Sequence, residues 1–233
     1  MEKRIILVGV GHVFDISKQI ETLIDLTNPD IVALELDRER LSFLMNPDIR
    51  GNGKPPLFYR ILAKMQEKIA SKYGVSTGSE MTAAVKKARD NNIGIVCIDK
   101  DVKHVLDRLW QSISLKRKIL LLFGGLSSFF IGKKKVEREL ESFEDSPLSY
   151  LDQMDEYFPE FKKILIDDRN KFMYQKLVKS LGIYDKIIAF VGEGHILGLE
   201  NLLRKHPDIL LDIIHLKDVR ENNLTALFNG NPI

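Results

Sequence analysis

The sequence predicts an α/β fold: a central, mostly parallel or mixed sheet flanked by helices, with a helical insertion between the third strand and the last strands. Short runs rich in Ile and Val recur with little alternation of polar and apolar residues, which is typical of strands buried on both faces. Segments with helical periodicity separate these runs, and residues 102–179 show helical periodicity without a convincing strand. A length of 233 residues suits one large domain, so we expect a single domain over 1–233 with 102–179 inserted in it.

The first predicted strand is Ile5–Val10. Ser17 is placed to cap a following amphipathic helix, which Asn28-Pro29-Asp30 ends before a second strand at Ile31–Leu36. A crossover of this length predicts two parallel strands joined with a right-handed connection. The loop Asn46–Pro56 is rich in Gly and Pro and could be a lid over a site.

A second helix is predicted from near Ser79 to Asn91-Asn92, and it leads into a third strand at Ile93–Ile98. Later in the chain, Ile187–Val191 predicts another buried strand, and Leu210–Leu216 could add a fifth.

Composition excludes several classes of protein. The 35 basic and 33 acidic residues nearly balance, and no strip of basic and aromatic residues indicates nucleic-acid binding. The single cysteine, Cys97, excludes an internal disulfide and favours a reducing compartment, so we expect a buried structural thiol and a cytoplasmic location.

Two apolar stretches have features of membrane segments. The run at the N-terminus is too short for a signal peptide and ends without a cleavage site. The run Ile119–Gly132 is shorter than the roughly 20 residues that a spanning helix needs and is broken by glycines and serines. We expect a helical hairpin or an exposed apolar helix, leaving open membrane-surface contact through residues 116–135 or homo-oligomerisation through Leu120–Phe123.

Polar residues that carry chemistry follow the predicted strands. Gly9-Val10-Gly11-His12 and Gly192-Glu193-Gly194-His195 have the same pattern, in which glycines allow a sharp turn and a histidine is presented at the sheet edge. Glu35 ends the second strand and Asp99 ends the third. Because ligands collect outside the carboxyl ends of parallel strands, we expect His12, Glu35, Asp99 and His195 to share one crevice.

Two imidazoles with carboxylates form a workable ligand set for Zn, Mn, Co or Fe, and an ion there would activate a water molecule for attack on a carbonyl or phosphoryl centre. General acid–base catalysis without a metal stays open. A dinucleotide loop is disfavoured because Asp15 stands where its third glycine belongs. The remaining candidates are interpreted as ordinary structural or surface residues: His104, His206 and His215, and, on a solvated helix face, Glu39 and Arg40.

With both Gly-x-x-His turns in view, the sequence resembles the TraB/PrgY family, part of a wider group that includes Tiki-type metalloproteases and GumN-like proteins and is distantly related to the erythromycin esterase and ChaN-like fold. The resemblance runs over nearly the whole chain. It is carried by the two histidine motifs, the second extending through Gly198, and by three further segments: Pro29–Arg38 with Glu35, Gly78-Ser79-Glu80-Met81, and Asp168-Arg169-Asn170 with Met173.

Three departures from the family pattern stand out. Asp168 replaces the usual glutamate, and Lys100 replaces a common arginine, which removes any bidentate contact there. The membrane helices at the C-terminus of PrgY-like members are not present up to Ile233, so we do not expect a membrane-anchored role in pheromone shutdown.

The resemblance implies metal-dependent hydrolysis of a peptide bond, with a divalent ion such as Mn, Co or Zn. His12, His195 and Glu35 would be ligands or catalytic groups. Glu80 would be a second carboxylate, or a helix-start residue favoured by the helix dipole. Arg169 would stabilise an oxyanion or hold a substrate carboxylate, or form an ion pair with a site carboxylate. Asp99 and Asp168 are candidates for contacts with the substrate.

Two functions follow as hypotheses. The first is a metal-dependent hydrolase acting on a peptide or a related amide or ester. The second is a binding protein on the same scaffold that sequesters a peptide, a small molecule or, by analogy with ChaN, a haem-like ligand without turnover.

Overall fold

The computed structural model describes residues 2–11, 15–46, 78–112 and 159–221. In space the chain divides into two compact units, residues 1–101 with 170–233, and residues 102–169. The first unit contains the sheet. The second contains helices only among its described residues: α5 (Val102–Ser112), α9 (Pro159–Lys162) and the π-helix η1 (Lys163–Asp167). The organisation as one domain with an insertion at 102–179 stays a prediction.

The core of the first unit is a five-stranded parallel sheet in the order β3-β2-β4-β1-β5. The predicted α/β class and the fifth strand are confirmed. The strands are β1 (Lys3–Val10), β2 (Ile31–Leu34), β3 (Gly94–Cys97), β4 (Lys186–Gly192) and β5 (Ile209–Ile214).

The fourth strand of the chain lies between the first two in the sheet. β4 pairs with β1 on one side and with β2 on the other, so β1 and β2 are parallel but not neighbours. Its register aligns Val10 with Gly192 and Leu34 with Phe190. The two Gly-x-Gly-His turns and Glu35 therefore follow strand ends that lie level at one edge of the sheet.

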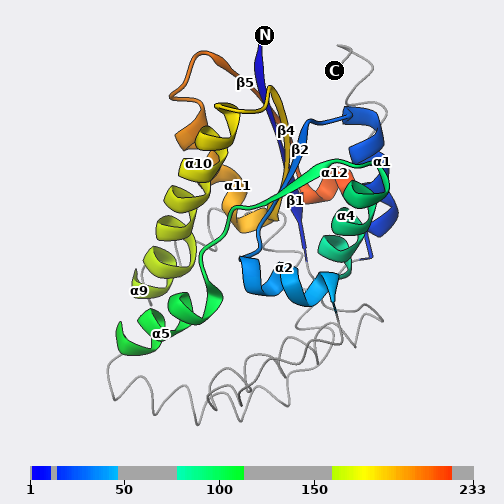
Figure 1. The fold of residues 1–233 in the computed structure, drawn as a ribbon. Helices are drawn as coiled ribbons and strands as arrows, with labels where there is room; N and C mark the ends of the chain where they lie inside the picture. The colour runs from blue at the N-terminus through cyan, green and yellow to red at the C-terminus, as the bar shows by residue number, and fades with distance from the viewer. Residues whose placement is uncertain (1, 12–14, 47–77, 113–158, 222–233) are drawn as a thin grey trace. The chain divides into compact units, whose positions relative to one another are not determined.

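Helices cover both faces of the sheet, which explains why the strand sequences do not alternate (Figure 1). One face packs Ile6 and Val8 against α1 (Ser17–Thr27), α4 (Ser79–Asp90) and α12 (Leu216–Arg220). The other packs Ile5 and Leu7 against α10 (Asp168–Leu181) and α11 (Glu193–Leu203). All four of these strand residues are completely buried.

Two local predictions are wrong. Ser17 is the first residue of α1 and forms no capping bond; instead its N–H donates to Asp15 Oδ1 at 3.3 Å. The third strand was expected to be buried on both faces, but β3 is an edge strand with exposed and half-buried positions, and Cys97 is half-buried. The predicted end of α1 is confirmed, since Asn28 adopts a left-handed conformation with φ 40°.

Two predicted features, the lid at 46–56 and the apolar stretch 119–132 with its partner surface, lie outside the described residues except for Asn46. Within the part of the chain that is described, no helix combines the length and apolarity needed to cross a membrane.

Candidate functional site

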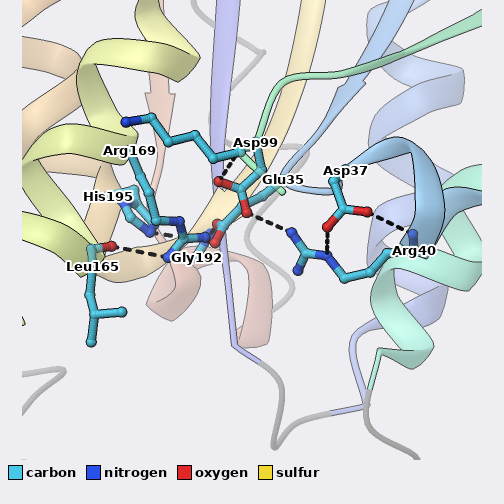
Figure 2. Close-up of polar contacts among 9 residues, drawn as sticks. Glu35, Asp37, Arg40, Asp99, Leu165, Arg169, Gly192 and His195 are labelled. Carbon is cyan, nitrogen blue, oxygen red and sulfur yellow. Dashed lines mark hydrogen bonds and ion pairs between the residues drawn. The ribbon is translucent and has the colours of Figure 1, made fainter. Parts of the chain in front are cut away.

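Glu35 and His195 meet at the carboxyl edge of the sheet, as the sequence predicted for these two residues. His195 Nε2 lies 3.4 Å from Glu35 Oε1, and their side chains are 5% and 8% exposed (Figure 2). Glu35 directly follows β2, and its N–H donates to the carbonyl of Phe190, which extends the β2–β4 ladder by one residue. His195 stands in the first turn of α11, after the last residue of β4.

The backbone after β4 fixes the Glu35 carboxylate. Gly192 N–H donates to Glu35 Oε2 at 2.5 Å, which leaves Oε1 directed at His195 (Figure 2). A Cβ on Gly192 would lie 3.3 Å from Oε2, so glycine permits this close approach. The first of the two glycines in the second histidine motif thus positions a carboxylate as well as turning the chain.

Asn170 orients the imidazole from its other side. The Nδ1 atom of His195 lies 2.7 Å from Asn170 Oδ1, and both residues are buried. Because an amide oxygen can only accept, Nδ1 carries the proton and donates it in this bond. Gly198 makes room for Asn170, since a Cβ there would overlap Asn170 Nδ2.

Asn170 belongs to the Asp-Arg-Asn segment of the family resemblance, but nothing in the local sequence pattern predicted a role for it. The signal that could have identified it is Gly198, one helical turn after His195 in the same motif. A glycine inside a helix lowers stability relative to alanine and, at a site, indicates a close neighbour.

Asp99 has a partner that the sequence did not predict. Arg40 donates from NH2 to Asp99 Oδ2 at 2.6 Å and from Nε to Asp37 Oδ2 at 2.8 Å (Figure 2). The Asp99 side chain is 2% exposed and also accepts from Lys100 N–H at 2.8 Å. The interpretation of Arg40 as a residue of a solvated face is wrong, because α2 (Arg38–Met45) directs it at two buried carboxylates.

The single cysteine lies near this ion-pair network. Burial raises the pKa of the Cys97 thiol above its usual value, and the negative charge of Asp37 adds to the effect. A thiol with a raised pKa is a poor nucleophile at neutral pH, which agrees with the structural role predicted for it.

The other predicted site residues lie in several places. Glu80 is in the first turn of α4 and is 1% exposed. Asp168 and Arg169 begin α10 and belong to the second unit, where Asp168 pairs with Arg108 at 3.1 Å. Arg169 donates to the Leu165 carbonyl at 3.0 Å (Figure 2). His12 lies outside the described residues, so its placement beside His195 stays a prediction.

The chemistry of the Glu35–His195 pair fits a divalent metal ion. With the proton on Nδ1, a neutral ring would direct its Nε2 lone pair toward the Glu35 carboxylate, and an imidazole nitrogen beside a carboxylate oxygen is a combination of ligands that divalent metal ions bind. Adjacent N and O ligands of a tetrahedral ion, with bonds of about 2.1 Å, lie about 3.4 Å apart, which equals the observed separation. In the described part of the chain, no three His, Cys, Asp or Glu side chains gather as a metal site, so further ligands would have to come from elsewhere.

Comparison with known proteins supports the family resemblance. Residues 2–207 match the model of the TraB/PrgY/gumN family. The chain is also similar to an uncharacterized protein of Methanocaldococcus jannaschii, with 29% identity over 238 residues that cover 96% of this chain. The chain spans only 60% of the length of that relative. The match over nearly the whole sequence places this chain in the TraB/PrgY/gumN family.

Proposed function

We propose that this chain is a metal-dependent hydrolase that cleaves a peptide or a related amide or ester bond. The observation that carries the proposal is the buried Glu35–His195 pair, in which His195 Nε2 lies 3.4 Å from Glu35 Oε1. Each partner is held from its far side, Glu35 by Gly192 N–H and His195 by Asn170. Such outer hydrogen bonds are typical of metal-ligating carboxylates and imidazoles.

The ligands that we assign to a divalent ion, such as Mn, Co or Zn, are His195, Glu35 and His12. When bound, the ion would act as a Lewis acid on the scissile carbonyl and lower the pKa of a water molecule. The hydrogen bond to Asn170 holds the His195 proton on Nδ1, so that Nε2 would keep the lone pair that binds the ion. Gly192 N–H stabilises the charged form of Glu35 and fixes which of its oxygens faces His195.

The remaining candidate residues have proposed roles in the reaction. Arg169 would stabilise the oxyanion of the tetrahedral intermediate or hold a substrate carboxylate. Glu80 would serve as a second carboxylate, and Asp99 and Asp168 would contact the substrate. Because Arg40 pairs with Asp99 at 2.6 Å, Arg40 would hold the Asp99 carboxylate in place for this contact. We place the activity in the cytoplasm because the single, half-buried Cys97 suits a reducing compartment.

Elemental analysis combined with hydrolysis assays tests the proposal. Purified protein is reconstituted with Mn, Co or Zn and assayed on a fluorogenic peptide-amide library and on p-nitrophenyl esters. His12→Ala, His195→Ala and Glu35→Gln are expected to lower bound metal and to reduce hydrolysis at least about 100-fold. The control is Glu200→Gln on α11, where the carboxylate pairs with Arg204 on an exposed face.

The result separates the two candidate functions. Equal, negligible metal in the wild-type protein and in all variants, with no hydrolysis, would remove the basis of the proposal. If wild-type protein instead binds peptides from the library without turnover, and Glu35→Gln binds them equally well, the non-catalytic binding protein is the correct function.

A further inference from the structure

The third strand leaves one side of the sheet open. Among the described strands β3 pairs only with β2, so it forms one end of the sheet. The hydrogen bond from Ile98 N–H to the Leu34 carbonyl, at 3.0 Å, shows which residues of this segment face β2. Because successive residues of a strand turn their backbone groups to opposite sides, the N–H and C=O groups of Ile95 and Cys97 point to the open side.

The open side of β3 is accessible to another chain. Gly94 is exposed, and the other residues of the strand are half-buried. In the part of the chain that the structure describes, no hydrogen bond reaches the outward groups of Ile95 or Cys97. β3 also carries no charged residue, whereas in β5, at the other end of the sheet, Asp212 pairs with Arg4 at 2.6 Å. Since charged side chains in an edge strand oppose further pairing, β3 is the edge suited to accept another strand.

Basic side chains lie beside this edge strand. Lys100 follows β3, and its Nζ lies 5.8 Å from the centre of the Phe172 ring. Lys176 reaches the same ring from α10, with its Nζ 5.4 Å from the ring centre. Although burial raises the pKa of the Cys97 thiol, the charges of Arg38 and Lys176 act against this rise, which places both beside the strand. Three cations thus gather at one edge of the sheet.

These three cations are available to a ligand, because none of them forms an ion pair within the described ranges. The buried carboxylates at this end of the sheet, Asp37 and Asp99, are both bonded to Arg40. Two exposed carboxylates, Glu39 and Asp101, each already interact with another residue. The side chains left to contact an added strand are therefore cationic, and an acidic ligand complements them.

We propose that β3 binds an acidic, extended peptide as an added strand, and that this peptide is a part of the substrate remote from the scissile bond. The identity of the peptide as a substrate rests on the proposed hydrolase function. In recognition by strand addition, main-chain hydrogen bonds give affinity and side-chain contacts give specificity. Ile95 and Cys97 supply the main-chain groups, and the three cations select Asp and Glu residues of the peptide.

Strand spacing relates this edge to the Glu35–His195 pair. Leu34 in β2 aligns with Cys97 in β3, so the two strands end level, and Glu35 directly follows β2. A peptide added to β3 lies two strand spacings from β2, about 10 Å, which about three extended residues span. The edge is therefore a remote binding site that takes no part in the chemistry. With four residues along β3, it favours substrates of at least about seven residues.

A proline substitution tests the main-chain contacts. The probe is a fluorescein-labelled peptide of alternating Val and Glu, about eight residues long, whose anisotropy is followed as wild-type protein is added. Ile95→Pro removes the outward N–H and leaves the bonds between β3 and β2 in place, because an edge strand tolerates proline where the missing donor faces solvent. Ile95→Ala is the matched control, since it shortens the side chain but keeps the N–H. We expect Ile95→Pro to bind the peptide about tenfold more weakly than Ile95→Ala.

Charge reversal tests the selectivity for acidic residues. Lys100→Glu combined with Lys176→Glu should weaken binding of the Glu peptide about tenfold and strengthen binding of the same peptide with Lys in place of Glu. Lys205→Glu is the control, because this exposed lysine precedes β5 at the other end of the sheet, and it should change neither affinity. Thermal unfolding shows whether each variant is folded. If Ile95→Pro does not fold, the charge reversal still decides the result.

The inference is overturned if Ile95→Pro and Ile95→Ala bind equally, if wild-type protein binds the Glu and Lys peptides equally, or if it binds neither. A wild-type dimer that Ile95→Pro converts to a monomer in sedimentation equilibrium would show that a second copy occupies the edge, which also overturns the inference. Mass spectrometry after each titration, with Mn, Co or Zn added, shows whether the peptide was cleaved. Binding without cleavage would contradict the proposed hydrolase function and would leave the peptide-binding edge supported.

Discussion

The close contact between Gly198 and Asn170 predicts whether Gly198→Ala raises or lowers the free energy of unfolding. In an ordinary helix interior, Gly→Ala raises stability by about 0.5–1 kcal/mol, because alanine loses less backbone entropy on folding. At position 198 the new Cβ would overlap Asn170 Nδ2 and lie 3.1 Å from its Cγ. Asn170 is 3% exposed, so its side chain cannot simply turn into solvent.

The costs of Gly198→Ala therefore exceed the gain. Overpacking of a filled interior costs about 1–3 kcal/mol. If Asn170 moves instead, His195 loses its buried 2.7 Å hydrogen bond, which costs about 1–3 kcal/mol. Since part of the clash is relieved by movement, the two costs are not fully additive, and we expect a net loss of about 1–4 kcal/mol in the free energy of unfolding.

Urea denaturation of four proteins tests this reasoning: wild type, Gly198→Ala, Asn170→Ala and the double variant. Removal of the asparagine opens the space, so Gly198→Ala should stabilise the Asn170→Ala background by up to about 1 kcal/mol. The sign of the alanine effect should thus reverse between backgrounds, and the two effects together give a coupling energy of about 1–5 kcal/mol. If Gly198→Ala stabilises the wild-type protein as well, the close contact between the two residues is refuted.

Three further predictions concern other parts of the first unit. Arg40→Leu removes the guanidinium that pairs with the Asp99 carboxylate, which is 2% exposed. This should lower the free energy of unfolding by about 1–3 kcal/mol, less than the loss of a fully buried ion pair, because Arg40 is 33% exposed. A double-mutant cycle with Asp99→Asn that shows no coupling would contradict this prediction. Because the pKa of Cys97 is raised, iodoacetamide should alkylate the native protein more slowly than a free peptide thiol, and the midpoint of the rate against pH should lie above the ordinary value of 9.0. Alkylation at the rate of the peptide thiol would show that burial does not lower the reactivity of Cys97. Hydrogen bonds from Lys87 and Asn91 lower the pKa of Asp25 below 3.8. The carboxylate therefore contributes stability above pH 3.8 and loses it as the pH falls through the lowered pKa. Asp25→Asn should cost at most about 0.5 kcal/mol at pH 7, because the side chain is 53% exposed, and thermal unfolding should show this cost shrinking as the pH falls below 3.8.

The fold was predictable because its signal is local. Runs such as Ile5–Val10 and Ile187–Val191 are apolar on both sides of the strand, and only a sheet covered on both faces buries such a pattern. The strand order was not predictable, because no local feature shows that β4 inserts between β1 and β2. The edge position of β3 follows from that order, which is why the expected burial of Ile93–Ile98 was wrong.

The site was predictable in part for the same reason. Glu35 and His195 follow strand ends, and parallel strands bring such residues to one edge. Arg40 was missed because its partner Asp99 lies 59 residues away, and an arginine in an amphipathic helix has the same local pattern whether or not it is paired. Asn170 was missed because the sequence does not show that α10 packs beside the His195 imidazole, and an asparagine in a helix has no local pattern that marks it as a partner of a histidine.

The first turn of α11 has a consequence for any redesign of this edge. Glu193 and His195 are two residues apart, and a helix advances about 100° per residue, so they leave its axis about 200° apart. Glu193 contacts His215, which follows β5, and His195 contacts Glu35, which follows β2. A substitution that changes the backbone of this turn would therefore move both side chains together. Neither the Glu35–His195 contact nor the Glu193–His215 contact can be changed alone by altering the start of α11.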